Sequence, residues 1–254
     1  MEGSTKCGFL GYLFLLLVLL PVMCYSQDNF VYSRATYYGS PDCYGTPSGA
    51  CGFGEFGRTV NDGNVAAVSY LYRNGSGCGA CYQVRCTNPK YCSGSGAIVV
   101  VTDHGEGDYT DFILSPRAYA KMAHPNTALQ LFSYGVVDVE FRRVSCQYPY
   151  YSTLKFKVHE HSRFPDYLAI LIIYVAGKND ITAVELWQED CKEWKGMRRS
   201  HGAVWDMANP PKDNIKLRFQ VSGSMGYGNW VVANNALPNY WKPGVAYDTD
   251  INLY

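Results

Sequence analysis

Three cysteines lie within ten residues in Gly77-Cys78-Gly79-Ala80-Cys81-Tyr82-Gln83-Val84-Arg85-Cys86, where glycine-rich turns lead into a predicted strand over 80–85. The chain has ten cysteines in all. An even number in an exported chain indicates disulfide bridges, because the extracellular compartment is oxidising. The Cys-x-x-Cys spacing also occurs in zinc and redox sites, but those need a cytosolic context, so we expect no metal. Eight cysteines remain after the N-terminal segment: Cys43, Cys51, Cys78, Cys81, Cys86, Cys92, Cys146 and Cys191.

Export is predicted from the first 26 residues. Lys6 precedes an apolar stretch over 9–20, Pro21 breaks it, and the small residue Ser26 follows, which is typical of a cleaved signal peptide. The apolar stretch is shorter than the roughly 20 residues of a membrane helix, and the chain ends in charged residues where a lipid anchor needs a hydrophobic tail. We therefore expect a secreted, extracellular protein that is not held in a membrane.

Composition limits the partners. The formal net charge is zero, which argues against nucleic acid. Aromatic residues make up 15% of the chain, including 22 Tyr, and flat rings suit the apolar C–H faces of sugars. We expect a monomer that binds polysaccharide and uses no cofactor.

Two domains follow the signal peptide. Seven of the eight remaining cysteines lie in residues 43–146, and a short linker, Gln147-Tyr148-Pro149-Tyr150-Tyr151, follows them. We place the signal peptide at 1–26, the first domain at 27–148 and the second at 149–254.

In the first domain a further strand is predicted over 97–102. A short helix is predicted over 65–73 with Asn64 as its N-cap, and another begins at Ser115, which can cap it ahead of Pro116. The second domain alternates apolar and polar residues over 154–159 and 216–221 and has further strand-like runs at 167–176, 181–188 and 230–233, as in a β-sandwich.

Five segments together resemble one family. Gly49-Ala50-Cys51-Gly52-Phe53-Gly54, the segment 77–86 and Val136-Val137-Asp138-Val139-Glu140-Phe141-Arg142-Arg143-Val144-Ser145-Cys146 are similar to the first domain of expansins. Trp194-Lys195-Gly196-Met197 and His201-Gly202-Ala203-Val204-Trp205 resemble the second domain. The similarity covers nearly the whole mature chain and is strongest to the plant expansin-like B group.

The resemblance implies a mainly β structure: a six-stranded double-psi β-barrel with short helices, like family 45 glycoside hydrolases, then an immunoglobulin-like β-sandwich. It also implies the bridges Cys51–Cys78, Cys81–Cys146 and Cys86–Cys92, although cysteine spacing allows other pairings. Cys43 and Cys191 are left over, and we expect them to bridge the two domains.

Acidic residues of the first domain raise the question of hydrolysis. An inverting glycosidase needs two carboxyl groups roughly 6.5–9.5 Å apart. Asp103 follows a predicted strand and is expected in a cleft, although a solvated loop aspartate fits as well. The candidates are Asp42, Asp103, Glu106, Asp108 and Asp111.

The family resemblance argues against catalysis. Expansins carry a His-Phe-Asp-Leu-Ser segment whose Asp matches the hydrolase acid, and the corresponding segment here is Asp111-Phe112-Ile113-Leu114-Ser115. Ile113 cannot donate a proton, so we expect no catalytic residue and no enzyme. Asp111 is either a partial substitute on the same side of the strand or an exposed turn residue. By the same resemblance, the remaining cleft positions are Thr36, Tyr38, Asp42 and Asp103.

Aromatic residues are the expected polysaccharide ligands. By resemblance, Tyr167 and Trp205 lie nearest the family's sugar-binding platform, Trp194 belongs to the same strand region, and His201 replaces a usual tryptophan. The alternative is that sandwich tryptophans pack the core. In the first domain Tyr38 rather than Tyr37 is expected to face the groove. The rings available in the second domain are Tyr167, Trp187, Trp194, Trp205 and Trp241.

We therefore predict a wall protein that binds cellulose or matrix glucan in a groove across both domains and loosens polymer contacts without hydrolysis. The alternatives are a weak endoglucanase using Asp103 with Asp108 or Asp111, and a structural or defence-related wall module. Asn74 is a possible glycosylation site. His159 and His161 share metal-compatible spacing but are expected to be solvated.

Overall fold

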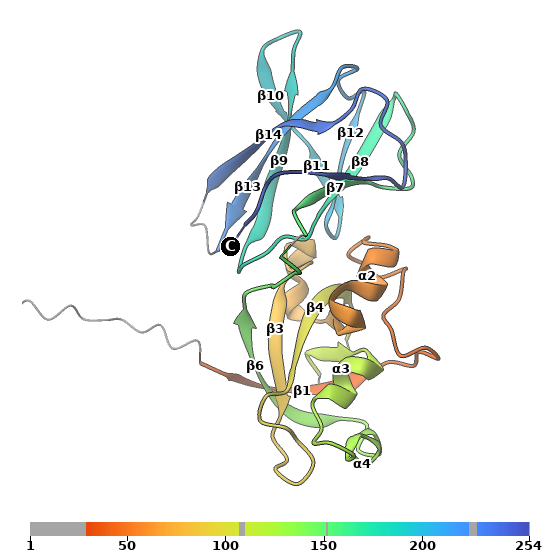
Figure 1. The fold of residues 1–254 in the computed structure, drawn as a ribbon, viewed down its shortest axis with the longest axis vertical. Helices are drawn as coiled ribbons and strands as arrows, with labels where there is room; N and C mark the ends of the chain where they lie inside the picture. The colour runs from red at the N-terminus through yellow and green to blue at the C-terminus, as the bar shows by residue number, and fades with distance from the viewer. Residues whose placement is uncertain (1–28, 107–109, 151, 224–227, 254) are drawn as a thin grey trace, which may run out of the picture.

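The computed structural model describes residues 29–106, 110–150, 152–223 and 228–253. These residues form two bodies stacked along the long axis, a barrel below and a sandwich above (Figure 1). The connection between them runs from the end of β6 (Val137–Val144) to the start of β7 (Lys155–Val158), and it contains the predicted boundary. The predicted signal peptide lies outside the described residues.

The lower body is a closed six-stranded barrel in the order β1-β5-β2-β4-β3-β6. The pairs β1–β5 and β2–β4 are parallel and the other pairs are antiparallel. The double-psi β-barrel expected from the sequence is thus confirmed. Its remaining strands are β1 (Val31–Tyr37), β2 (Val65–Val68), β3 (Cys81–Cys86), β4 (Ala97–His104) and β5 (Phe112–Leu114).

One predicted helix is wrong. The segment 65–73 forms strand β2 and then the 3₁₀ segment η2 (Tyr70–Gly75). All four residues of β2 are buried between β4 and β5. A strand buried on both faces has no apolar–polar alternation, so its sequence looks like a helix stripe.

The second predicted helix is confirmed as α3 (Pro116–Lys121). The Ser115 hydroxyl accepts a hydrogen bond from the Ala118 N–H at 3.2 Å, and Pro116 occupies the first turn. Three further short helical segments cover the barrel: α2 (Glu55–Thr59), η1 (Val60–Gly63) and α4 (Ala128–Phe132).

The upper body is the expected β-sandwich. One sheet has the order β10-β9-β13-β14 and the other β11-β12-β8-β7-β15. Phe156 and Phe219, one from each sheet, meet edge to face in the core. The strands are β8 (Tyr167–Ile173), β9 (Asp180–Gln188), β10 (Glu193–Gly196), β11 (Arg198–His201), β12 (Val204–Ala208), β13 (Ile215–Ser222), β14 (Asn229–Leu237) and β15 (Ala246–Asp248).

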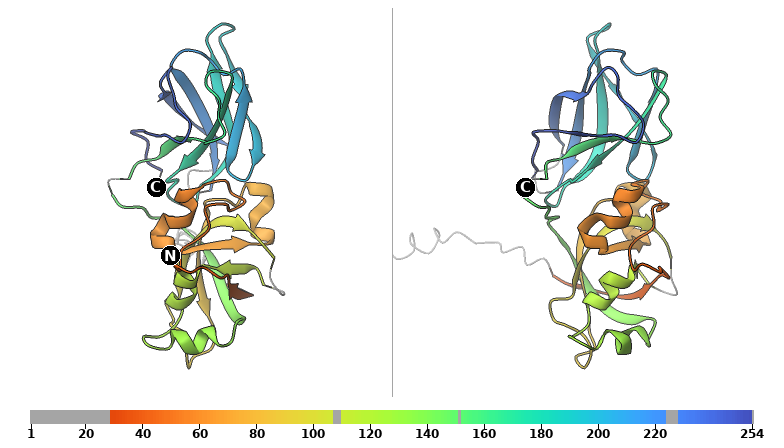
Figure 2. Two further views of the ribbon diagram at one scale, coloured as in Figure 1. Left: turned by 90° about the vertical axis from the view of Figure 1, so that its right-hand side faces the viewer. Right: turned by 45° about the vertical axis from the view of Figure 1, so that its right-hand side comes forward.

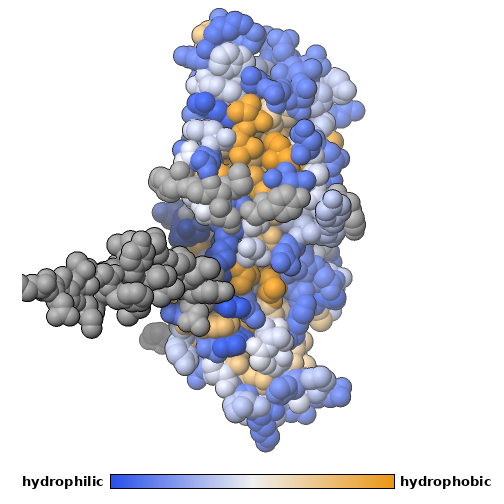
Figure 3. All heavy atoms as spheres, turned by 60° about the vertical axis from the view of Figure 1, so that its left-hand side comes forward, coloured by the Kyte–Doolittle hydropathy of each residue, from blue (hydrophilic) through white to orange (hydrophobic). Residues whose placement is uncertain are grey.

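The five-stranded sheet joins the sandwich to the barrel. Alternate residues of β8 belong to different cores: Ile170 packs in the sandwich, whereas Leu171 packs in the cluster that includes barrel residues. The Ala203 N–H also donates to the Cys51 carbonyl at 3.0 Å across the junction. The views in Figure 2 show the sandwich stacked directly on the barrel, and Figure 3 shows apolar patches on both bodies. The domains therefore share a packed contact.

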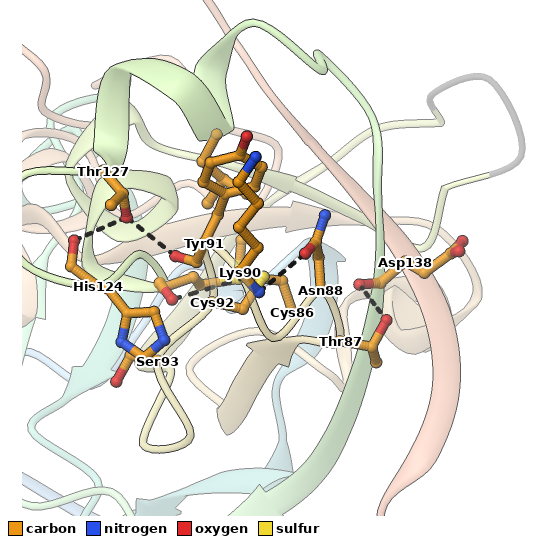
Figure 4. Close-up of a disulfide and its surroundings, with 12 residues drawn as sticks. Cys86, Thr87, Asn88, Lys90, Tyr91, Cys92, Ser93, His124, Thr127 and Asp138 are labelled. Carbon is orange, nitrogen blue, oxygen red and sulfur yellow. Dashed lines mark hydrogen bonds between the residues drawn. A yellow bond between two sulfur atoms is a disulfide. The ribbon is translucent and has the colours of Figure 1, made fainter.

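The three disulfides implied by the resemblance are confirmed: Cys51–Cys78, Cys81–Cys146 and Cys86–Cys92. The last closes a short loop whose Tyr91 carbonyl accepts from the His124 N–H and the Thr127 hydroxyl (Figure 4). All three bridges hold the loop-rich barrel or its exit.

The expected bridge between Cys43 and Cys191 is wrong, since both cysteines are free and exposed. Cys191 belongs to the connection between β9 and β10, at the end of the sandwich far from the barrel (Figure 1). Cys43 lies in the barrel loop between β1 and α2. Packing and hydrogen bonds, rather than a bridge between these cysteines, hold the junction.

Candidate functional site

Four residues form a row across the outside of the barrel. Strand pairing aligns Thr36 with Ile113, Ile113 with Ala67, and Ala67 with Asp103, across β1, β5, β2 and β4. Phe112 and Leu114, the neighbours of Ile113, are fully buried inside the barrel, so Ile113 faces outward. The structure thus brings two of the expected cleft residues, Thr36 and Asp103, into one row, with isoleucine and alanine between them.

Asp103 ends this row and anchors the loop above it. Its Oδ1 accepts from the Ala50 N–H at 2.6 Å and from the His104 N–H at 2.8 Å. A Cβ atom on Gly49 would lie 2.5 Å from the Thr102 carbonyl oxygen, so only glycine allows this loop to approach β4 so closely. The Asp103 carboxylate therefore holds the loop at Gly49 and Ala50 against β4.

Tyr38 and Asp42 lie beside the same end of the row. Burial, with the charges of Asp103 and Asp42, raises the pKa of Tyr38. Asp42 accepts from the Ser40 hydroxyl at 2.8 Å and pairs with Arg58, and these donors lower its pKa to about 2. An acid with this pKa is ionised at physiological pH and cannot act as a general acid.

Tyr37 points the other way. Its ring packs against Tyr119 at 4.8 Å and Phe132 at 4.7 Å, which leaves Tyr38 as the tyrosine beside Asp103.

Asp111 is held by hydroxyl groups at one end of the barrel. Its carboxylate accepts from the Ser69 hydroxyl at 3.1 Å and from the Ser33 hydroxyl at a shorter distance. Both carboxylate oxygens are thus occupied by hydroxyl donors of the protein, so Asp111 is held away from the position of Ile113 in the row. Asp108 lies outside the described residues, and Glu106 is exposed.

On the sandwich, Tyr167 belongs to a hydrogen-bonded group. Its hydroxyl donates to Asp206 Oδ2 at 2.8 Å, and Arg198 donates to both oxygens of Asp206 at 3.0 and 2.7 Å. Arg198 lowers the pKa of Asp206, whose carboxylate is 4% exposed. These contacts fix the Tyr167 ring on the outer face of the five-stranded sheet.

His201 connects the barrel cleft to this sheet. A Cβ atom on Gly52 would lie 3.0 Å from His201 Nε2 and 2.5 Å from Val204 Cγ2. On the barrel side, the Tyr72 hydroxyl donates to the Ala50 carbonyl, next to the loop that Asp103 holds. A continuous surface therefore runs from the row through the 49–52 loop to His201.

The remaining expected rings do not lie on this surface. Trp205 is 5% exposed and packs in the sandwich core, with the Arg199 guanidinium 4.2 Å from its ring. Trp194 lies on β10, in the other sheet, and Trp241 is buried. The expectation of a platform shared by Tyr167, Trp194 and Trp205 is therefore wrong for both tryptophans. The alternation of β12 turns Trp205 into the core, and β10 carries Trp194 on the opposite sheet.

Two smaller predictions concern His159 and Asn74. His159 is 8% exposed rather than solvated, and its Nδ1 accepts from the His161 N–H at 3.2 Å. Burial lowers the pKa of His159. No group of metal-binding side chains is found among the described residues. Asn74 is exposed, next to Gly75, which is buried against Gly202.

The sequence did not reveal Arg198 and Asp206, which position Tyr167. Arg198 and Asp206 are directly paired on β11 and β12, and the sequence does not show which residues of these two strands pair. In the part of the chain that the structure describes, no helix is long and apolar enough to cross a membrane.

The fold and this surface define a two-domain protein in which a double-psi barrel packs against a β-sandwich. The DPBB_1 family model, described as lytic transglycolase, matches residues 64–141, and the Expansin C-terminal domain model matches residues 154–238. Expansin-like B1 of Arabidopsis thaliana is 59% identical over 238 residues, covering 93% of this chain and 94% of that protein. The chain belongs to the expansin family.

Other similarities agree. Expansin-like B1 of Oryza sativa subsp. japonica is 44% identical over 240 residues and covers 93% of both chains. A mutant Clavibacter michiganensis expansin solved in complex with cellohexaose has a TM-score of 0.65 at 21% identity, covering 88% of this chain and 97% of that one. This structural likeness concerns the fold.

Proposed function

We propose that this protein is secreted to the plant cell wall, binds β-glucan along the surface from Thr36 to Tyr167, and separates polymer contacts without hydrolysis. The observation that carries the proposal is the position of Ile113. It stands at the centre of the row, between Thr36 and Ala67, where a glycosidase would need an acid.

The neighbouring carboxylates support a binding role. Asp42, Asp103 and Asp111 each accept hydrogen bonds from protein donors, and hydrogen bonds from Ser40 and Arg58 lower the pKa of Asp42. Carboxylates also accept hydrogen bonds from sugar hydroxyls, and Asp42 lacks the raised pKa of a general acid.

The bound ligand of the Clavibacter michiganensis expansin is consistent with this proposal, since cellohexaose is a β-glucan oligomer. In this chain, Tyr167 offers a fixed ring for stacking, and its hydroxyl is already satisfied by Asp206. His201 provides a smaller flat group between Tyr167 and the barrel.

The binding test is a pull-down on cellulose with Tyr167→Ala and, as the matched control, Tyr240→Ala. Tyr240 is 69% exposed on the same domain and lies in the connection between β14 and β15. Loss of one stacking ring removes about 1 kcal/mol, so Tyr167→Ala should weaken binding about fivefold, and Tyr240→Ala should not. Equal binding by both variants would refute the proposed surface.

The competing endoglucanase function is tested separately by release of reducing ends from soluble β-glucan. The proposal expects none from the natural chain. Sustained release that Asp103→Asn abolishes would establish hydrolysis instead.

A further inference from the structure

Three of the five tryptophans lie on the outer face of the four-stranded sheet. Trp194 of β10 pairs directly with Trp187 of β9, and Trp230 lies on β14 opposite Gln220 of β13. Lys216 and Arg218 of β13 stand between these rings. We call the set Trp187, Trp194, Lys216, Arg218 and Trp230 the ladder face.

Rings and cations alternate along the ladder face. The Trp187 and Trp194 rings meet at 5.3 Å, and Lys216 Nζ lies 5.6 Å from the centroid of each. Arg218 Cζ lies 4.6 Å from the Trp194 centroid and 4.3 Å from that of Trp230. The rings thus hold two positive charges in defined positions above the sheet.

This face lies in the opposite layer from the proposed β-glucan surface. Tyr167 and Asp206 belong to the five-stranded sheet, which packs toward the barrel, whereas the ladder face belongs to the other sheet (Figure 1). Trp230 is 36% exposed and Val232 beside it is 45% exposed. The ladder face is therefore a second, separate surface.

The charges on the ladder face indicate its ligand. Arg218 pairs with Glu185 at 2.6 Å, while Lys216 has no ion pair within the described part of the chain. The nearby Glu189 already accepts from the Trp187 indole and from Lys192. One cation is thus open to a ligand, and a second would need only to exchange Glu185 for another carboxylate.

Neutral sugars fit this arrangement poorly, because the cations lie over the rings that would stack on them. A polymer that carries carboxylates on stiff pyranose rings fits better: its carboxylates meet Lys216 and Arg218, and its C–H faces meet the exposed side chain of Val232. We propose that the ladder face binds an acidic polysaccharide of the polyuronate class. Together with the β-glucan surface, it would let one molecule contact two polymers.

The direct test is binding of the full mature chain to polygalacturonate at low ionic strength. Lys216→Gln with Arg218→Gln should weaken binding at least about tenfold, because two charge-assisted contacts are lost. The matched control, Lys212→Gln with Lys242→Gln, removes the same charge from exposed positions on the same domain and should change little. Rising salt should weaken the wild type, and fully methyl-esterified polymer should not bind.

A variant with the opposite effect excludes misfolding as the cause. Glu185→Gln frees Arg218 from its partner and should tighten binding to polygalacturonate. The two surfaces are separated by Tyr167→Ala, which should weaken binding to cellulose and leave binding to polygalacturonate unchanged. The inference is overturned if the wild type fails to bind polygalacturonate, or if the charge control loses as much affinity as the ladder variant.

Discussion

Gly202 sits where the two domains touch most closely, and its replacement by alanine tests whether the junction is rigid. Its φ of +47° belongs to the left-handed region. A Cβ atom built on it would lie 2.5 Å from Cys51 Cα and nearer still to the Ala50 carbonyl oxygen. Backbone atoms cannot move aside as a side-chain tip does, so Gly202→Ala must push the sandwich away from the barrel.

The matched control is Gly244→Ala. Gly244 has a φ of +77°, but the nearest atom to its Cβ position, Glu160 Cγ, is 3.8 Å away. This variant carries only the left-handed backbone strain, about 1 kcal/mol. Gly202→Ala carries the same strain and also loses two contacts. The hydrogen bond from Ala203 to Cys51 is worth about 1 kcal/mol, and the lost part of the burial of Val204 about 1 to 2 kcal/mol.

Urea denaturation should therefore show a loss of about 3 to 4 kcal/mol in the free energy of unfolding for Gly202→Ala, against about 1 kcal/mol for the control. Separation of the domains should also divide one unfolding transition into two and weaken binding to cellulose, because the proposed surface crosses the junction. Equal losses in the two variants, with a single transition in both, would refute the reasoning.

Two more predictions concern stability. Replacing Cys81 and Cys146 by alanine removes a bridge of sequence separation 65 and should lower the free energy of unfolding by about 4 kcal/mol through chain entropy. Replacing Cys86 and Cys92, with separation 6, should lower it by about 2 kcal/mol. Thermal unfolding measures both losses, and the reverse order would contradict this account. Burial lowers the pKa of His159, near Lys157, Glu160, His161 and His201, so the unfolded chain takes up this proton first as pH falls. The resulting penalty is absent well above pH of about 6.5, grows as pH falls below it and is complete below the folded-state pKa. The melting temperature of His159→Asn should therefore fall less than that of the wild type between neutral and acidic pH. Parallel falls in the two proteins would contradict this prediction.

Much of the architecture followed from local chemistry. The cap at Ser115 and the alternation of β7 and β13 depend on neighbours within a few residues, and the structure has both as predicted. The three bridges and the double-psi barrel came from the resemblance to expansins, since cysteine spacing alone allows other pairings. Local patterns carry this information because the periods of helices and strands repeat within one element.

The candidate site depended on contacts that no local pattern contains. The row of Thr36, Ile113, Ala67 and Asp103 exists because four strands distant in sequence pair in one register. In the sandwich, the register of β12 turns Trp205 into the core, and the pairing of β10 with β9 places Trp194 on the opposite sheet. In a sandwich, apolar and aromatic side chains occur on both faces, so a strand's own residues do not say which face is covered. That choice is made by the elements packed against it, and here the barrel covers one sheet and leaves the ladder face of the other open.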